Sequence, residues 1–261
     1  MQFSANLGFL FTDLTLPDAI RAAKLHGFDA VECHFPYDVA AGDVAAALAE
    51  TGLAMLGLNT SRGDVGAGEF GLCALPDAQA RARAAIDQAV GYAALIGAQN
   101  VHVMAGKTDG GIAAEAMFRG NLAYACKAAA PQGIGILIEP INTRDVPGYH
   151  LSTADHAAQI IADLHLPNLK MMFDCYHLEI MQGNLAALYA RHHPIIGHVQ
   201  IAALPDRGEP DKGTLDYMDL LPQLAKIGLP TPIGAEYKPR QGPTINGLNW
   251  LPKFQSLTPS P

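Results

Sequence analysis

Three carboxylates and one amide lie near the ends of four consecutive apolar segments of the chain. They are Glu139 in "IGILIEP", Asp174 in "LKMMFDC", Gln200 in "IGHVQIA" and Glu236 in "PIGAEYK". If the fold brings these segments together, a cation must offset the charge, because burying an unpaired carboxylate is costly. An oxygen-rich ligand set suits Mg²⁺ or Mn²⁺ better than zinc, which accepts thiolates. The alternative is a hydrogen-bond network without metal.

Several other polar residues could contact a substrate near these segments. His177 follows Asp174 by three residues and could reach over the same site. The remaining candidates are His102 in "NVHVMAG", His34 in "ECHFPYD", Arg207 in "LPDRGEPDKG", and Lys238 and Arg240 in "EYKPRQG". For the histidines the alternative is a core residue with satisfied hydrogen bonds, and for the cations a solvated loop position. We expect His192, His193 and His198 at helix ends or on the barrel exterior.

Strand and helix patterns alternate from one end of the chain to the other. Eight short apolar segments occupy residues 3–9, 29–35, 53–59, 100–106, 134–140, 169–175, 196–202 and 232–238. Helical periodicity lies between them, for example at residues 16–27, 77–97 and 153–166, with Gly27 and Gly97 closing the first two and Ser152 or Thr153 preceding the third. The pattern predicts a single (β/α)8 TIM barrel over residues 1–261, with an open doubly wound sheet as the second choice. In a barrel the carboxyl ends of the strands share one face, where Glu139, Asp174, Gln200 and Glu236 would meet.

A glycine-rich stretch at residues 66–71, "GAGEFG", matches a dinucleotide-binding pattern only in letters. It neither follows a strand directly nor opens a helix, as that motif requires. We expect instead a long mobile loop from Thr60 to Leu75 that closes over the substrate as a lid. The sequence also contains no phosphate-binding P-loop, no G-x-S-x-G and no H-E-x-x-H.

Composition excludes several classes of protein. The chain of 261 residues is 49% hydrophobic and 16% charged, with a mean hydropathy of +0.13, so it can bury a large core. Its net charge of −8 argues against a nucleic-acid partner. No apolar run reaches the roughly 20 residues of a membrane span, and the N-terminal stretch has no export-signal pattern. The four scattered cysteines fit free buried thiols in a cytoplasmic protein.

The motifs "LIEPIN", "MMFDCYH", "HVQIA" and "GAEYKPR" together resemble the hydroxypyruvate isomerase family, one of the xylose-isomerase-like barrels. The resemblance covers nearly the whole chain, including "NVHVMAG" and "LPDRGEPDKGTLDY". It implies that Glu139, Asp174, Gln200 and Glu236 are the metal ligands and that Glu139 and Glu236 transfer the proton. Glutamine at position 200 differs from the histidine usual in the similar ketose 3-epimerases.

The resemblance implies a metal-dependent isomerisation of hydroxypyruvate to tartronate semialdehyde (2-hydroxy-3-oxopropanoate) through an enediolate, within glyoxylate and carbohydrate metabolism. Arg207, His177 and Lys238 are the candidates for binding the substrate carboxylate, and His102 is a further candidate site residue. Relatives acting on 2-oxo-tetronates share most of the motifs. The stretch "GEFG" resembles their version, because typical hydroxypyruvate enzymes carry arginine where Phe70 stands here.

Two other classes of function match the sequence less well. A metal-dependent nuclease on the same barrel would need several histidine ligands and a basic groove, which this acidic chain matches poorly. A sugar-acid binding protein that had lost its chemistry would be favoured by the loss of either glutamate, yet both are present. A small-molecule substrate is therefore expected, with a homo-oligomer as a possible assembly.

Overall fold

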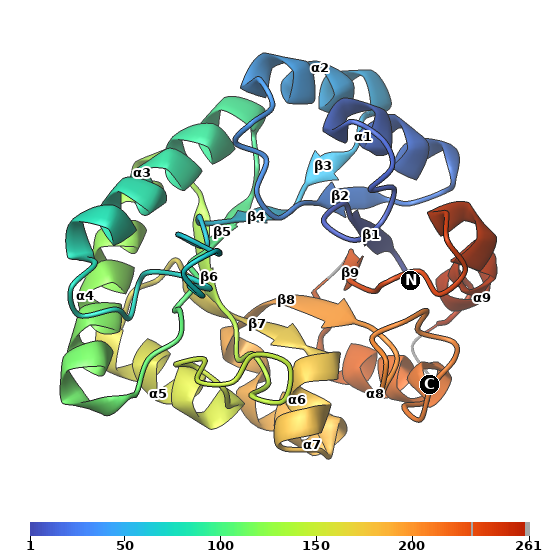
Figure 1. Cartoon of the computed structure of the whole chain (residues 1–261). Helices are drawn as coiled ribbons and strands as arrows, with labels where there is room; N and C mark the ends of the chain where they lie inside the picture. The colour runs from blue at the N-terminus through green and yellow to red at the C-terminus, as the bar shows by residue number, and fades with distance from the viewer. Residues whose placement is uncertain (231, 259–261) are drawn as a thin grey trace.

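Buried apolar segments alternate with amphipathic ones, and the chain folds the first into parallel strands and the second into helices around them (Figure 1). The computed structural model describes residues 1–230 and 232–258. Its strands are β1 (Phe3–Asn6), β2 (Ala30–Glu32), β3 (Ala54–Met55), β4 (Gly57–Asn59), β5 (Asn100–His102), β6 (Gly135–Ile138), β7 (Leu169–Asp174), β8 (Ile196–Ile201) and β9 (Ile233–Ala235).

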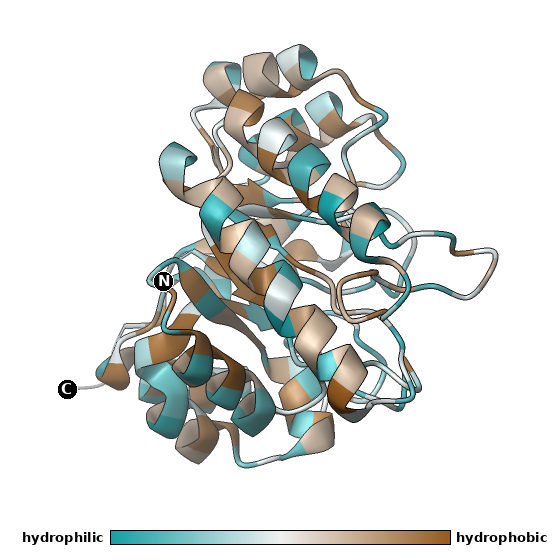
Figure 2. Ribbon diagram, turned by 90° about the vertical axis from the view of Figure 1, so that its left-hand side faces the viewer, coloured by the Kyte–Doolittle hydropathy of each residue, from teal (hydrophilic) through white to brown (hydrophobic). Residues whose placement is uncertain are grey.

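The helices connect these strands and cover the outside of the barrel. They are α1 (Leu16–Leu25), α2 (Ala41–Thr51), α3 (Gln79–Ile96), α4 (Gly111–Ala129), α5 (Ala154–Leu164), α6 (Cys175–Met181), α7 (Leu185–His192), α8 (Tyr217–Ile227) and α9 (Leu251–Gln255), with 3-10 turns at Ala130–Gln132, His193–Ile195 and Thr244–Trp250. Hydrophilic and hydrophobic stretches alternate along the helices facing the viewer in Figure 2, as expected of helices with one face on the core. Within the described residues, no helix combines the length and hydropathy needed to cross a membrane.

One apolar segment, residues 53–59, is divided into β3 and β4. The strand order is β3-β2-β1-β9-β8-β7-β6-β5-β4, so β3 pairs with β2 while β4 pairs with β5. Between the two pieces, the Leu56 N–H donates to the Val31 carbonyl at 2.8 Å, which keeps the segment attached to β2. The predicted (β/α)8 barrel is confirmed, with its third strand split in two.

The predicted helix ends also agree with the structure. The Thr153 hydroxyl accepts a hydrogen bond from the His156 N–H at the start of α5. Gly97 ends α3 with a φ of 69°, a left-handed conformation that glycine adopts without steric penalty. The four cysteines are free and buried, as expected.

An aromatic cluster joins β1 to the C-terminal helix. The Trp250 ring lies 5.3 Å from both Phe3 and Phe254, with edge-to-face geometry. Nearby, the Met1 ammonium donates to the Gln255 carbonyl at 2.5 Å. These contacts hold β1 in place. Because β1 pairs with β9, they also position β9, the strand that ends just before Glu236.

The loop expected to act as a lid is only partly free of the barrel. Leu72, Cys73 and Ala74 are buried, and the Ala74 N–H donates to the Ala105 carbonyl at 2.7 Å. Gly71 and Gly106 face each other so closely that a Cβ on Gly106 would lie 2.4 Å from the Gly71 carbonyl oxygen. The exposed part of the loop is therefore confined to residues 64–68, and the predicted boundary at Leu75 extends too far.

We expect the substitution Gly106→Ala to lower the free energy of unfolding by about 2 kcal/mol or more. The new methyl group would clash with the Gly71 backbone, and Gly106 has a φ of 98° that disfavours alanine. Urea unfolding would measure the change. Gly91→Ala is the control, because Gly91 lies within α3 with no atom near a would-be Cβ. That control should be neutral or slightly stabilising, and equal stability of the two variants would contradict the prediction.

Candidate active site

A cavity of 610 Å³ opens at the carboxyl ends of the strands. Its size falls within the range of about 300 to 1,000 Å³ typical of small-molecule sites. Of the residues proposed from the sequence, it is lined by His34, His102, Glu139, His177, Arg207, Glu236 and Lys238. Strand ends far apart in the sequence thus deliver their polar side chains to one cavity, as barrel topology predicts.

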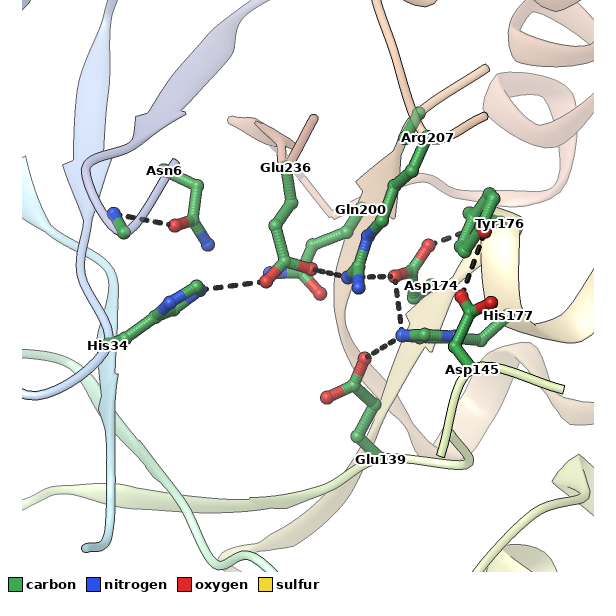
Figure 3. A network of polar contacts seen from close by, with 12 residues as sticks. Asn6, His34, Glu139, Asp145, Asp174, Tyr176, His177, Gln200, Arg207 and Glu236 are labelled. Atoms are coloured by element: carbon green, nitrogen blue, oxygen red, sulfur yellow. Dashed lines mark hydrogen bonds and ion pairs between the residues drawn. The ribbon is translucent and has the colours of Figure 1, made fainter. Parts of the chain in front are cut away.

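The Arg207 guanidinium joins two of the predicted carboxylates (Figure 3). Its Nη2 donates to Glu236 Oε2 at 2.8 Å and to Asp174 Oδ2 at 3.3 Å. The guanidinium also lies over the Phe9 and Tyr176 rings, 5.1 and 5.2 Å from their centroids. A half-buried arginine held between two buried carboxylates supplies the positive charge that their burial requires.

The backbone of Arg207, whose side chain lies between these carboxylates, has an unfavourable conformation. Its φ is 57°, in the left-handed region that non-glycine residues seldom occupy. Hydrogen bonds on both sides fix it, from its own N–H to the Ala203 carbonyl at 2.9 Å and from the Lys238 N–H to its carbonyl at 2.7 Å. Such strain concentrates at functional sites, which supports a role for Arg207 in the site.

His177 lies between Asp174 and the third carboxylate, Glu139. Its Nε2 is 3.5 Å from Asp174 Oδ2 and 3.7 Å from Glu139 Oε1, and Figure 3 shows the ring between them. The Asn142 side chain contacts the opposite ring nitrogen, Nδ1, at 2.6 Å and so orients the imidazole. Asp174 is also the N-cap of α6, because it accepts the Tyr176 N–H at 2.8 Å. The capping bond uses Oδ1 and leaves Oδ2 to face Arg207 and His177.

The carboxyl groups differ in the protonation that their surroundings favour. Burial, followed by the charges of Glu236 and Asp174, raises the pKa of Glu139 well above its ordinary value. Burial also raises the pKa of Asp174 to about 7, although Arg207 opposes it. Burial acts in the same direction on Glu236, but Arg207 and His34 outweigh it and hold the pKa of Glu236 below its ordinary value. His34 Nε2 lies 2.8 Å from Glu236 Oε1.

Gln200 and His198 line a smaller pocket together with Glu32, a buried carboxylate that was not among the residues proposed from the sequence. Glu32 Oε2 is 2.6 Å from His198 Nε2, and Gln200 Nε2 donates to Glu32 Oε1 at 3.3 Å. The exterior position expected for His198 is therefore wrong, since alternation along β8 turns it inward with Gln200. Alternation continued from β2 into the residues that follow it places Glu32 on the same face as His34, a signal that was present in the sequence.

The oxygen atoms offered here fit a divalent cation. Glu139, Asp174 and His177 each offer a ligand atom within 4.8 Å of the others. Glu139 Oε1 and Gln200 Oε1 are buried and have no hydrogen-bond partner among the described residues. Buried acceptors without a donor are costly, and binding of an ion by these atoms would remove that cost. His177 joins the candidate ligands in geometry, where the sequence analysis expected a substrate contact.

Two cations in the cavity have no carboxylate partner within the described residues. Lys238 lines the cavity with its Nζ 5.7 Å from the Phe9 ring centroid. Arg62, which the sequence analysis did not single out, lies 4.7 Å over the Phe35 ring and 6.0 Å from Phe70. Both are available to an anionic substrate.

Other candidate residues lie elsewhere or serve different contacts. Arg240 forms ion pairs with Asp206 and Glu209 at 2.6 and 2.7 Å, outside the cavity lining. His102 lines the cavity, with Nδ1 3.5 Å from Glu139 Oε2 and Nε2 without a partner. His192 ends α7 and His193 lies in the exposed turn that follows, as expected.

Comparisons with known proteins agree with this geometry. The family model described as "Xylose isomerase-like TIM barrel" matches residues 20–254. The chain is 44% identical to a 2-oxo-tetronate isomerase of Cupriavidus necator, over 97% of this chain and 98% of that protein. It is 35% identical to a hydroxypyruvate isomerase of Escherichia coli, over 98% of this chain and 100% of that protein. A crystal structure titled AP endonuclease, family 2, from Brucella melitensis superposes with a TM-score of 0.92 at 37% identity, covering 97% of this chain and 98% of that one.

We expect Arg207→Gln to destabilise the EDTA-treated protein by about 3 kcal/mol at pH 7, because it leaves two buried carboxylates without their cation. In the parent, Arg207 holds the pKa of Glu236 below its ordinary 4.5, so this stabilisation is present above pH 4.5 and is lost as the pH falls. The difference between parent and variant should therefore narrow in acid, which urea unfolding across a pH series would measure.

Arg191→Gln is the control for this experiment, because Arg191 forms an exposed ion pair with Asp155 at 3.1 Å. Removing that pair should change the free energy of unfolding by no more than about 1 kcal/mol. A loss for Arg207→Gln as small as that of the control would contradict the role assigned to Arg207.

Proposed function

The chain belongs to the xylose isomerase-like TIM barrel family and, by full-length similarity to curated isomerases, is an isomerase; we propose that it interconverts hydroxypyruvate and tartronate semialdehyde (2-hydroxy-3-oxopropanoate). The observation that carries the proposal is the pair of buried glutamates, Glu139 and Glu236, that line one cavity from strands β6 and β9. Two carboxyl groups that favour different protonation, facing one substrate, are what a proton transfer between neighbouring carbons requires.

We propose that Glu139, Asp174, Gln200 and Glu236 hold one Mg²⁺ or Mn²⁺. The unpartnered oxygens of Glu139 and Gln200 support this assignment. A divalent cation held by these residues would polarise the substrate carbonyl and so acidify the neighbouring C–H bond. Arg207 contacts Glu236 and Asp174 in the structure, so it lies beside the same oxygens and close to where the substrate would bind.

The two glutamates move the proton. One removes a proton from C3 of hydroxypyruvate, and the electron pair forms the enediolate. The other glutamate delivers a proton to C2, while the O3 hydroxyl loses its proton and the oxygen on C2 gains one. The product, tartronate semialdehyde, has the same atoms with the carbonyl moved by one carbon. Each transfer contributes about 10² to 10⁴ in rate.

Neutral histidines complete the cavity. Burial lowers the pKa of His177 to about 3, and the pKa of His102 to about 4. At neutral pH both rings are therefore uncharged and orient the substrate by hydrogen bonds. Arg62, Lys238 and Arg207 are the residues that would bind the substrate carboxylate. The two arginines are favoured because a guanidinium group can form two parallel hydrogen bonds with a carboxylate.

A second substrate class, the 2-oxo-tetronates, is favoured by a specific feature of the cavity. Phe70 lines its wall, with the ring centroid 6.0 Å from the Arg62 guanidinium, at the position where the resemblance to typical hydroxypyruvate enzymes leads one to expect arginine. The relative from Cupriavidus necator is named for this class. Comparing turnover of hydroxypyruvate, 2-oxo-tetronates and neutral ketoses, with and without EDTA, decides between them and tests the need for a metal.

The cellular location, substrate class and partners of the protein are also proposed. We propose a cytoplasmic enzyme acting on a small hydroxy-oxo acid, in carbohydrate and glyoxylate metabolism, without a nucleic-acid partner. The net charge of −8 and the buried thiols support this. A homo-oligomer stays a prediction.

We expect Glu139→Gln and Glu236→Gln each to lower kcat by about 10² or more, because glutamine keeps an oxygen and the volume but accepts no proton. The double variant should be little worse than either single variant, since the two residues act as a unit. Steady-state kinetics with Mn²⁺ present would measure this. Glu179→Gln, on α6 outside the cavity lining, is the control and should keep parental activity. A folded, metal-loaded Glu236→Gln enzyme with parental turnover would remove Glu236 from the mechanism.

We expect Arg62→Gln to raise KM for acidic substrates about tenfold or more while changing kcat little, because the lost contact binds the carboxylate rather than the reacting carbons. For a neutral ketose the same variant should behave like the parent. Arg144→Gln is the matched control, because Arg144 is exposed and absent from the cavity lining. An unchanged KM for every acidic substrate would show that Arg62 does not bind the carboxylate.

A further inference from the structure

A second cavity, of 400 Å³, lies outside the reaction site and is lined by two histidines and a glutamate. Glu115 comes from the first half of α4, His150 from the loop after β6, and His156 from the first turn of α5. None of the three lines the reaction cavity. Figure 1 shows α4 and α5 as neighbours on the outside of the barrel, with direct contacts between them.

The three side chains converge on one point. His150 Nε2 and His156 Nε2 each lie 3.0 Å from the same oxygen, Glu115 Oε2, and all three atoms fall within 4.8 Å of one another. Ligands arranged tetrahedrally around zinc, at about 2.0 to 2.2 Å from it, are separated by about 3.3 to 3.6 Å. The two histidine–glutamate separations of 3.0 Å are a few tenths of an ångström shorter than this, so a small movement of each ring away from Glu115 would let both histidines and the glutamate bind one ion.

Neighbouring groups orient these side chains as the surroundings of a metal site do. Thr108 Oγ1 lies 3.0 Å from His150 Nδ1, which directs Nε2 of that ring toward Glu115. Arg119 Nε donates to Glu115 Oε1 at 2.6 Å and leaves Oε2 to the histidines. Arg119 is fixed in turn by Asp163 at 2.8 Å. Partners of this kind set ring orientation and hold a carboxylate to one ligating oxygen.

The cavity leaves room for a fourth ligand of the ion beside the three side chains. Gly110 and Gly111 line it, and a Cβ at either position would meet no atom within 4 Å. Solvent and an ion therefore have free access, and a water molecule can complete the coordination. Two imidazole nitrogens and one carboxylate oxygen select a borderline transition-metal ion over Mg²⁺, which takes oxygen ligands.

We propose that Glu115, His150 and His156 form a zinc site that is separate from the reaction centre. A bound ion would link α4, α5 and the loop that follows Glu139, so it would stabilise the fold around the reaction cavity without touching the substrate. The alternative for the same contacts is a hydrogen-bond network alone, in which both histidines donate to Glu115.

The test counts zinc in the tag-free protein. The full chain, stripped with EDTA and dialysed against micromolar ZnCl₂, is compared with His156→Ala and Glu115→Gln. Each variant should retain one equivalent of zinc less than the parent, because the reaction site is intact in all three. His156 is partly exposed, and glutamine at position 115 still accepts from Arg119, so both variants should fold; the melting temperature without metal checks this.

A second readout is the rise in melting temperature on adding zinc, since an ion that binds only the folded state stabilises it. That rise should shrink in both site variants and stay parental in His193→Ala, which removes an exposed histidine elsewhere. Equal zinc content and equal thermal shifts in the parent and both site variants would overturn the proposal. Loss of an equivalent in His193→Ala alone would also overturn it, because the ion would then bind elsewhere.

Discussion

The crowding of carboxylates inside the barrel mouth is the constraint on which the rest of the site depends. Glu139, Asp174 and Glu236 are buried within reach of one another, and Glu32 lies just below them. Like charges at such distances cannot all remain ionised without a positive partner. Arg207 supplies one such charge by adopting a left-handed backbone conformation. The contacts of Arg207 and the unpartnered oxygens are consequences of placing so many acids together, whereas the histidines are neutral because burial lowers their pKa.

Residues on strands were predictable from the sequence, because a barrel fixes where each strand end lies. Glu139, Asp174 and Glu236 follow apolar segments directly, and they line or adjoin one cavity as expected. The same alternation would have found Glu32 through His34, which lies two residues later, just beyond the end of β2. The interior position of His198 was missed because its neighbours "IIGHVQ" were not assigned to faces of the strand.

Residues on loops could not be predicted in the same way. Arg62 follows β4 by three residues, and no periodic pattern indicates which way its side chain points. Only the fold shows that Phe35 and Phe70 hold it at the cavity. The length of the lid was overestimated for a similar reason. A glycine-rich sequence indicates freedom, whereas the glycines at positions 71 and 106 serve close backbone contact between the loop and the segment after β5.

The pairing of β1 with β9 joins Phe3 to Ile233 and makes the last strand the one that completes the barrel. During synthesis, β1 can pair with β2 early, but its other edge has no partner until more than 200 further residues have been made. An exposed strand edge of this kind invites pairing with other chains. Glu236 directly follows β9, so the nascent chain has no complete set of acidic groups while that edge is open. The crowding of charge is thus postponed until the barrel that can hold it has closed.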